Sequence, residues 1–64
     1  MNRASALKAL DDAMADEMKL LFHVFVQGFE TNDKHSTDRF RNGLKIHLAA
    51  YTAAEQAITE TIGE

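Results

Sequence analysis

The segment from Met18 to Phe29, with the sequence MKLLFHVFVQGF, restricts the fold more than any other part of the chain. Large apolar side chains occupy eight of its twelve positions, namely Met18, Leu20, Leu21, Phe22, Val24, Phe25, Val26 and Phe29. A helix that is covered on one side only needs an apolar stripe about 100° wide. This segment is apolar over a wider arc, so we expect it to contact more than its own chain.

The chain has 64 residues, which corresponds to one small domain near the lower size limit for independent folding. It contains no Cys, which excludes disulfides, thiolate metal sites and thiol nucleophiles. The three His residues argue against a structural zinc site. Domains of this size usually gain the missing burial by associating with other chains, so we predict a homo-oligomer, a dimer or larger.

The net charge of −3 argues against a general DNA-binding or RNA-binding protein. The N-terminus lacks the basic start and apolar core of a secretory signal. The apolar run around Phe22 is interrupted by His23 and Gln27 and is too short to span a bilayer. We therefore predict a cytoplasmic protein with no membrane association.

Nothing in the sequence interrupts a helix between about residues 5 and 30, and Asn2 or Ser5 is suited to cap it. Its apolar residues fall on one arc of roughly 200°. That arc contains Leu7, Leu10, Met14, Met18, Leu21, Phe22, Phe25 and Phe29. His23 lies on the opposite, polar stripe, and we interpret it as a solvated histidine.

The polar segment 31–36 (TNDKHS) predicts a short turn, followed by a second helix over about residues 37–62. Ser36 or Thr37 is expected to cap this helix, Asp38 to lie in its first turn, and Gly63 to end it. One face carries Phe40, Leu44, Leu48, Tyr51, Ile58 and Ile62. A second face carries Ile46, Ala50, Ala53, Ala54 and Ala57, mostly small residues that allow another helix to approach closely.

The two helices have nearly equal lengths of about 38 Å, which predicts an all-α antiparallel two-helix hairpin as a single domain over residues 1–64. One hairpin cannot cover both the wide apolar arc and the alanine-rich face. We expect hairpins to assemble into a helical bundle or a higher symmetric oligomer. The expected protein-interface residues are Phe22, Phe25, Val26, Phe29, Ile46, Ala50, Ala53 and Ala57.

Two polar side chains near the apolar arcs bear on register and activity. If the turn centres near Lys34, Glu17 lies level with Tyr51, and a hydrogen bond between them would fix the register. His47 lies at the edge of the core face, where a hydrogen-bonded interface histidine is favoured over a catalytic base.

The sequence has no Gly-rich phosphate loop and no catalytic triad in a strand-turn-helix context. We therefore predict a protein that is not an enzyme and that binds no metal and no cofactor.

A cluster of four basic residues surrounds the expected start of the second helix. Residues 34–47 contain Lys34, Arg39, Arg41 and Lys45, and Asp38 is the one acidic residue among them. Helix N-termini attract anions through their free amides and the helix dipole. Arg39, Arg41, Lys45 and His47 are therefore candidate ligand-binding residues. The alternative is a solvated basic face that balances the acidic segments of neighbouring subunits.

The string DRFRNGLKIHL, from Asp38 to Leu48, resembles the phage family of helical-hairpin sponge proteins that counter CBASS and Thoeris defence. The shared features are an Arg before a large aromatic residue (Arg39-Phe40), a basic residue (Lys45) and a His-Leu pair (His47-Leu48). This sequence has Phe40 where the family usually has tryptophan. The resemblance implies an oligomer of hairpins that sequesters a cyclic oligonucleotide or related signal between subunits without cleaving it.

Three binding roles follow from these patterns. The first is sequestration of an anionic nucleotide signal. The second is a small antagonist or adaptor that docks on a host protein through exposed Phe22, Val26 and Phe29. The third is a Rop-like RNA-binding hairpin, which this chain resembles in length and topology only.

Overall fold

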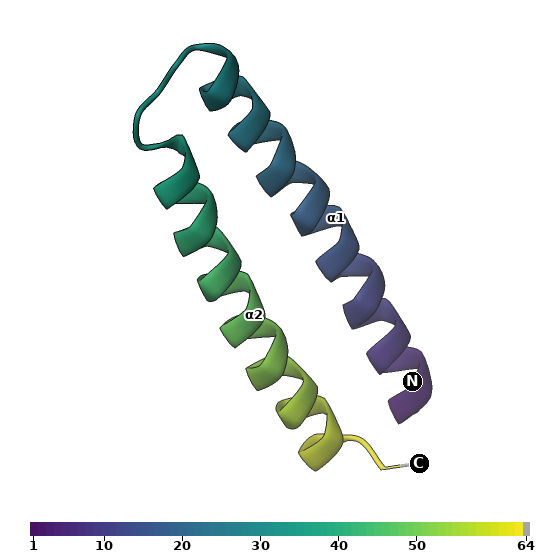
Figure 1. Cartoon of the computed structure of the whole chain (residues 1–64). Helices are drawn as coiled ribbons and strands as arrows, with labels where there is room; N and C mark the ends of the chain where they lie inside the picture. Colours follow the sequence, from purple (N-terminus) through teal and green to yellow (C-terminus); the bar gives the residue numbers. More distant parts are fainter. Residues whose placement is uncertain (64) are drawn as a thin grey trace.

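The computed structural model of the chain describes residues 1–63 and contains two α-helices joined by a tight turn (Figure 1). α1 spans Arg3–Glu30 and α2 spans Ser36–Thr61. The helices run antiparallel and side by side, so the start of α1 and the end of α2 lie together, opposite the turn (Figure 1). No strand occurs in the described residues, and the predicted all-α hairpin is confirmed.

The beginning of α1 is capped by a side chain. Asn2 has extended backbone angles, and its Oδ1 accepts a hydrogen bond from the backbone N–H of Ser5 at 2.8 Å. This bond satisfies one of the first-turn amides, which have no partner inside the helix. Of the two predicted caps, Asn2 is the one that acts.

α1 ends in a Schellman motif built around Asn32, whose φ of 57° is the one positive φ outside glycine in residues 1–63. The N–H of Asp33 donates to the carbonyl of Gly28 at 3.0 Å, and the N–H of Asn32 donates to the carbonyl of Phe29 at 3.2 Å. Asn tolerates this left-handed conformation better than most residues. The predicted polar turn is therefore confirmed.

The beginning of α2 differs from the prediction that Ser36 or Thr37 caps it. The N-cap residue is His35, which makes no side-chain hydrogen bond to the helix. Ser36 is the first helical residue and is only 6% exposed, because it packs against Gly28 of α1. Asp38 lies in the first turn, as predicted.

The end of α2 also differs from the expected glycine stop. Ile62 is extended, with φ −107° and ψ 118°, and its N–H still donates to the carbonyl of Ile58. Gly63 has no positive φ. The chain thus leaves the helix through an extended residue, without the left-handed glycine that often ends helices.

Half-buried side chains at intervals of three and four residues form the seam between the helices, as in other antiparallel helix pairs. The seam consists of Leu7, Leu10, Met14, Met18, Leu21 and Phe25 on α1 and Phe40, Leu44, His47, Tyr51, Ala54 and Ile58 on α2. Leu48 was predicted for this face but is 56% exposed. Leu48 follows the seam residue His47 directly. Because successive residues of an α-helix are rotated by about 100°, its side chain points away from the seam.

The turn end of the hairpin is closely packed. The Phe25 ring stacks on Phe40 with 4.6 Å between the ring centroids. A Cβ added at Gly28 would lie 2.9 Å from the Cβ of Ser36. The absence of a side chain at Gly28 therefore allows the helices to meet near the turn.

The hairpin buries little of its apolar surface. Ala6 is the only apolar residue that counts as buried in residues 1–63, and none of the described side chains is fully buried. The radius of gyration is 14.9 Å, against about 11 Å for a compact domain of this length. Large apolar side chains that stay exposed are Met1, Leu20, Phe22, Val24, Phe29, Ile46 and Leu48.

Candidate functional site

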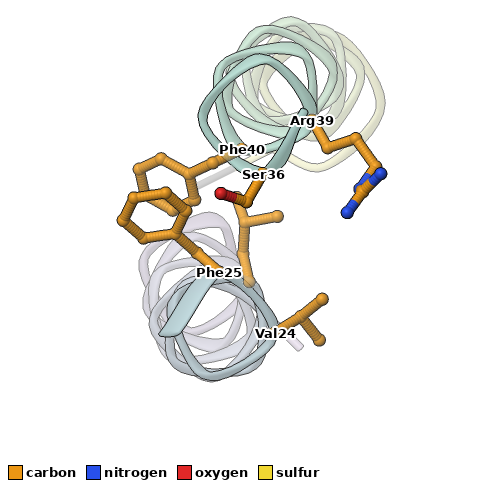
Figure 2. Close-up of a pocket in the computed structure, with 6 residues that line it drawn as sticks. Val24, Phe25, Ser36, Arg39 and Phe40 are labelled. Atoms are coloured by element: carbon orange, nitrogen blue, oxygen red, sulfur yellow. The ribbon is translucent and has the colours of Figure 1, made fainter. Parts of the chain in front are cut away.

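The exposed apolar residues lie on two opposite faces of the hairpin. In the view along the helix axes in Figure 2, Val24 and Arg39 project to one side, and the rings of Phe25 and Phe40 project to the other. The first side, here the small-residue face, consists of Ala13, Glu17, Leu20 and Val24 on α1 and Arg39, Gly43, Ile46, Ala50, Ala53 and Ala57 on α2. The second, here the aromatic face, consists of Phe22, Val26 and Phe29 on α1 and Arg41, Lys45 and Leu48 on α2.

The small-residue face is continuous across both helices. Near the turn, Val24 of α1 and Arg39 of α2 line one pocket. Nearer the termini, Ala13 and Glu17 of α1 line a shallow groove together with Ala50 of α2. The predicted interface residues Ile46, Ala50, Ala53 and Ala57 all lie exposed on this face.

The aromatic face is anchored on the packed turn end. Phe22 and Phe29 are 57% and 69% exposed, and Val26 between them is half-buried. Both exposed rings lie next to the seam residue Phe25. The distance between ring centroids is 6.4 Å from Phe25 to Phe22 and 6.2 Å from Phe25 to Phe29. Phe25 is half-buried in the seam, where its ring stacks on Phe40, and its predicted contact with a second chain stays a prediction.

The four predicted ligand-binding residues do not share one face. Arg39 lies on the small-residue face and forms a salt bridge with Asp33 in the turn. Arg41 and Lys45 lie one turn apart on the aromatic face, and Nη1 of Arg41 lies 3.4 Å from a carboxylate oxygen of Asp38. His47 lies in the seam and is half-buried. Three of the four thus have an acidic side chain of the same chain beside them.

His47 joins the two helices at mid-length. Its Nδ1–H donates to the carbonyl of Gly43 at 2.7 Å, and its Nε2 lies 3.4 Å from a carboxylate oxygen of Glu17. The bond to the Gly43 carbonyl, followed by the bond and charge of Glu17, raises the pKa of His47 above its usual value of 6.5. The expectation of a hydrogen-bonded histidine is confirmed at the interface between α1 and α2.

The predicted hydrogen bond between Glu17 and Tyr51 is wrong. The hydroxyl of Tyr51 donates to Asp11, and this bond raises the pKa of Tyr51 above its usual value of 10.0. The register differs by about one helical turn, because the chain reverses at Asn32 rather than near Lys34.

The start of α2 adjoins a cavity of about 90 Å³ that is lined by Leu21, Val24, Phe25, Ser36, Arg39 and Phe40 (Figure 2). Pockets for small molecules usually measure about 300–1,000 Å³, so a single hairpin does not enclose a nucleotide here. In residues 1–63, His, Asp and Glu side chains form no group of three that is arranged to hold a metal ion. None of the described helices is both long and apolar enough to cross a membrane.

Two features of the site were missed in the sequence. Asp33 organises the turn, because its Oδ1 accepts from the N–H of His35 at 2.9 Å while its other oxygen binds Arg39. An Asp inside a polar turn segment commonly bonds the backbone two residues later, which was the available signal. Gly28 and Gly43 lie where α1 and α2 pack closely together, and glycine inside an uninterrupted helix pattern indicates such contacts.

Comparison of the chain with protein-family models, with curated proteins and with solved structures finds no match. The similarity of residues 38–48 to the sponge proteins therefore stays a prediction.

Proposed function

We propose that this chain is a non-enzymatic binding protein that docks on another protein through its aromatic face. The observation that supports the proposal is the exposure of Phe22 and Phe29, at 57% and 69%. Their neighbour Phe25 already closes the seam with Phe40, so neither exposed ring is needed to hold the hairpin together.

The aromatic face has the composition of a protein-binding patch. Burying a Phe or Leu side chain contributes about 1.5–3 kcal/mol, and a few buried aromatic residues dominate the affinity of many interfaces. Phe22, Phe29 and Leu48 are available for such burial. Arg41 and Lys45 lie on the same face beside these apolar residues, which favours a partner surface with an apolar centre and acidic residues around it.

The proposal is tested with one substitution on the aromatic face and one outside it. Phe29→Asp should abolish capture of the partner from a lysate of the source cells and its binding in purified form, while the helix content stays unchanged. His23→Asp is the matched control, since His23 is exposed on the same helix but belongs to neither face. Equal binding by Phe29→Asp and the unsubstituted chain would refute docking through the aromatic face.

A second candidate function is sequestration of an anionic nucleotide signal, without cleavage, between copies of the chain. The observation that favours it is the start of α2, where His35 provides no side-chain cap and Arg39 lies close by. First-turn amides and a guanidinium are suited to phosphate oxygens. The cavity at this place is small, so the ligand would have to be enclosed by more than one hairpin.

Calorimetry distinguishes the second candidate. The panel contains cyclic di- and trinucleotides and ADP-ribose derivatives, with recovery of the intact ligand after denaturation of the complex. Arg39→Ala and Lys45→Ala should each weaken binding, whereas Lys8→Ala, at the far end of the hairpin, should not. An absence of heat with the whole panel, or binding that neither substitution changes, would contradict nucleotide sequestration.

A further inference from the structure

We infer that the small-residue face is the contact surface between two copies of this chain, which pair into an antiparallel four-helix bundle. This inference concerns the face opposite the one assigned to a partner protein, and it does not rest on that assignment. Four observations carry it: the residue spacing, the exposed area, the length of the face and the position of its charges.

The spacing on the small-residue face repeats that of the seam. On α2 the residues of this face fall at intervals of four, three, four, three and four residues, at Arg39, Gly43, Ile46, Ala50, Ala53 and Ala57, all of them exposed except the half-buried Gly43. On α1 the intervals are four, three and four, at Ala13, Glu17, Leu20 and Val24. This alternation is typical of helix surfaces that pack against neighbours in a bundle. Each helix thus has a second packing surface that its own hairpin leaves open.

The exposed area matches what a second copy would cover. The hairpin exposes 4958 Å², whereas a compact monomer of 7.2 kDa exposes about 4,100 Å². The excess of roughly 850 Å² is close to the approximately 800 Å² that each partner buries in an interface of standard size. Covering one broad side of the hairpin would therefore bring its exposed area to the level of a compact protein.

The small-residue face also offers the longer surface for helix packing. It extends from Ala13 to Val24 on α1 and from Arg39 to Ala57 on α2, and its alanines allow neighbouring helices to approach closely. The aromatic face does not continue to the termini. On the same side of the hairpin, Asp11 of α1 and Glu55 of α2 lie at the positions that apolar residues occupy near the turn. The aromatic face is therefore apolar only in the half near the turn.

The charges on the small-residue face are complementary to those of a second copy. Glu17 and Arg39 are its charged residues, and their side chains are 57% and 60% exposed. Arg39 lies about eight residues, or roughly 12 Å, closer to the turn than Glu17 does. If a twofold axis lies in the interface at the level of Leu21 and Gly43, Arg39 of each copy comes to the level of Glu17 of the other, diagonally across the interface. A twofold dimer requires such a self-complementary surface. The same axis would place Leu20 and Ile46 near the centre of the contact.

The test uses substitutions in pairs that differ only in the face they occupy. Ile46 and Leu48 are two residues apart on α2 and are 67% and 56% exposed, and Val24 and Phe22 form the same kind of pair on α1. In sedimentation equilibrium the unsubstituted chain should have twice the chain mass. Ile46→Glu and Val24→Glu should weaken the dimer at least 100-fold, whereas Leu48→Glu and Phe22→Glu should leave it intact. A monomeric unsubstituted chain, or a dimer that dissociates on Leu48→Glu or Phe22→Glu instead, would overturn the inference.

A charge exchange decides the question if a glutamate on the apolar surface unfolds the hairpin. Glu17→Arg alone and Arg39→Glu alone place like charges opposite each other in the dimer, and each should weaken association. The double variant restores both pairs between the copies and should regain most of the lost affinity. It does not restore the bonds of Glu17 to His47 or of Arg39 to Asp33 within a hairpin. Recovery in the double variant therefore reports contacts between copies, and its absence would overturn the antiparallel arrangement.

Discussion

The imidazole of His47 makes its bonds to both helices only when it carries a proton on each nitrogen. The carbonyl of Gly43 accepts from Nδ1, and the carboxylate of Glu17 can only accept from Nε2. The charged form is therefore the one that the folded hairpin favours, which is the physical reason for the raised pKa of His47.

This raised pKa predicts a pH dependence of stability. A group whose pKa is higher in the folded state stabilises the fold fully below its unfolded value, about 6.5, and loses this contribution as the pH rises through the folded value. The free energy of unfolding should thus fall as the pH rises above about 6.5, the unfolded value. Urea unfolding of the unsubstituted chain, His47→Gln and Glu17→Gln checks this expectation. A fall of the same size in His47→Gln would assign the pH dependence to another group.

Gly28 is the residue at which a single methyl group should cost most. Its added Cβ would lie 2.9 Å from the Cβ of Ser36, which is fixed to the backbone and cannot rotate away. We expect Gly28→Ala to destabilise the hairpin by about 1–3 kcal/mol, although alanine favours helix. At Gly43 the nearest atom is the mobile Cδ1 of Leu21, so Gly43→Ala should cost less.

Urea unfolding of the two glycine variants checks this order. Gly63→Ala is the control, because nothing lies within 4 Å of the Cβ it would add. If Gly28→Ala is as stable as Gly63→Ala, the helices separate near the turn without cost, and the close contact with Ser36 is not needed.

At the scale of the elements, the helices themselves follow from the sequence. The predicted ranges 5–30 and 37–62 differ by at most two residues at each end from Arg3–Glu30 and Ser36–Thr61. Local features suffice here, since no Pro interrupts either helix and the turn residues are polar. The register was not predictable in the same way, because it depends on the left-handed Asn32 and on the distance at which Gly28 meets Ser36.

The candidate site shows the same division between local and long-range information. Exposure of Phe22 and Phe29 could be predicted, because the apolar arc is wider than one neighbouring helix covers. The environment of Arg39 could not, because Asp33 reaches it only after the turn has closed. Likewise, periodicity favours Leu48 for the seam, while the structure places His47 there, bonded to Gly43 and Glu17.

The start of α1 gives a prediction at the scale of one helix. The sequence allows either Asn2 or Ser5 as the cap, and the structure uses the Asn2 side chain. Asn2→Ala should therefore lower the free energy of unfolding by about 1 kcal/mol. Ser5→Ala keeps the bonded backbone N–H and should be nearly neutral in urea unfolding. Equal losses in the two variants would contradict the Asn2 cap.

At the scale of the whole molecule, the hairpin resembles half of a folded unit. Its broad side measures 48 by 16 Å, and its third dimension is 8 Å between the outermost Cα atoms. Such a shape has one layer of side chains between two helices and no enclosed interior. Stability must then depend on what covers the open faces, and chain concentration becomes a thermodynamic variable.

If two copies pair, the Tm should rise with protein concentration. A hundredfold increase, from about 1 to 100 μM, favours the folded dimer by about 2.7 kcal/mol, or about 1.4 kcal/mol per chain. For a domain of this size that corresponds to a shift of roughly 10 °C, which is easily resolved by circular dichroism. The Leu48→Glu variant should show the same slope, because it leaves the small-residue face intact. The Ile46→Glu variant should melt at a lower temperature that no longer depends on protein concentration. If the Tm of the unsubstituted chain also does not depend on concentration, the hairpin is stable by itself.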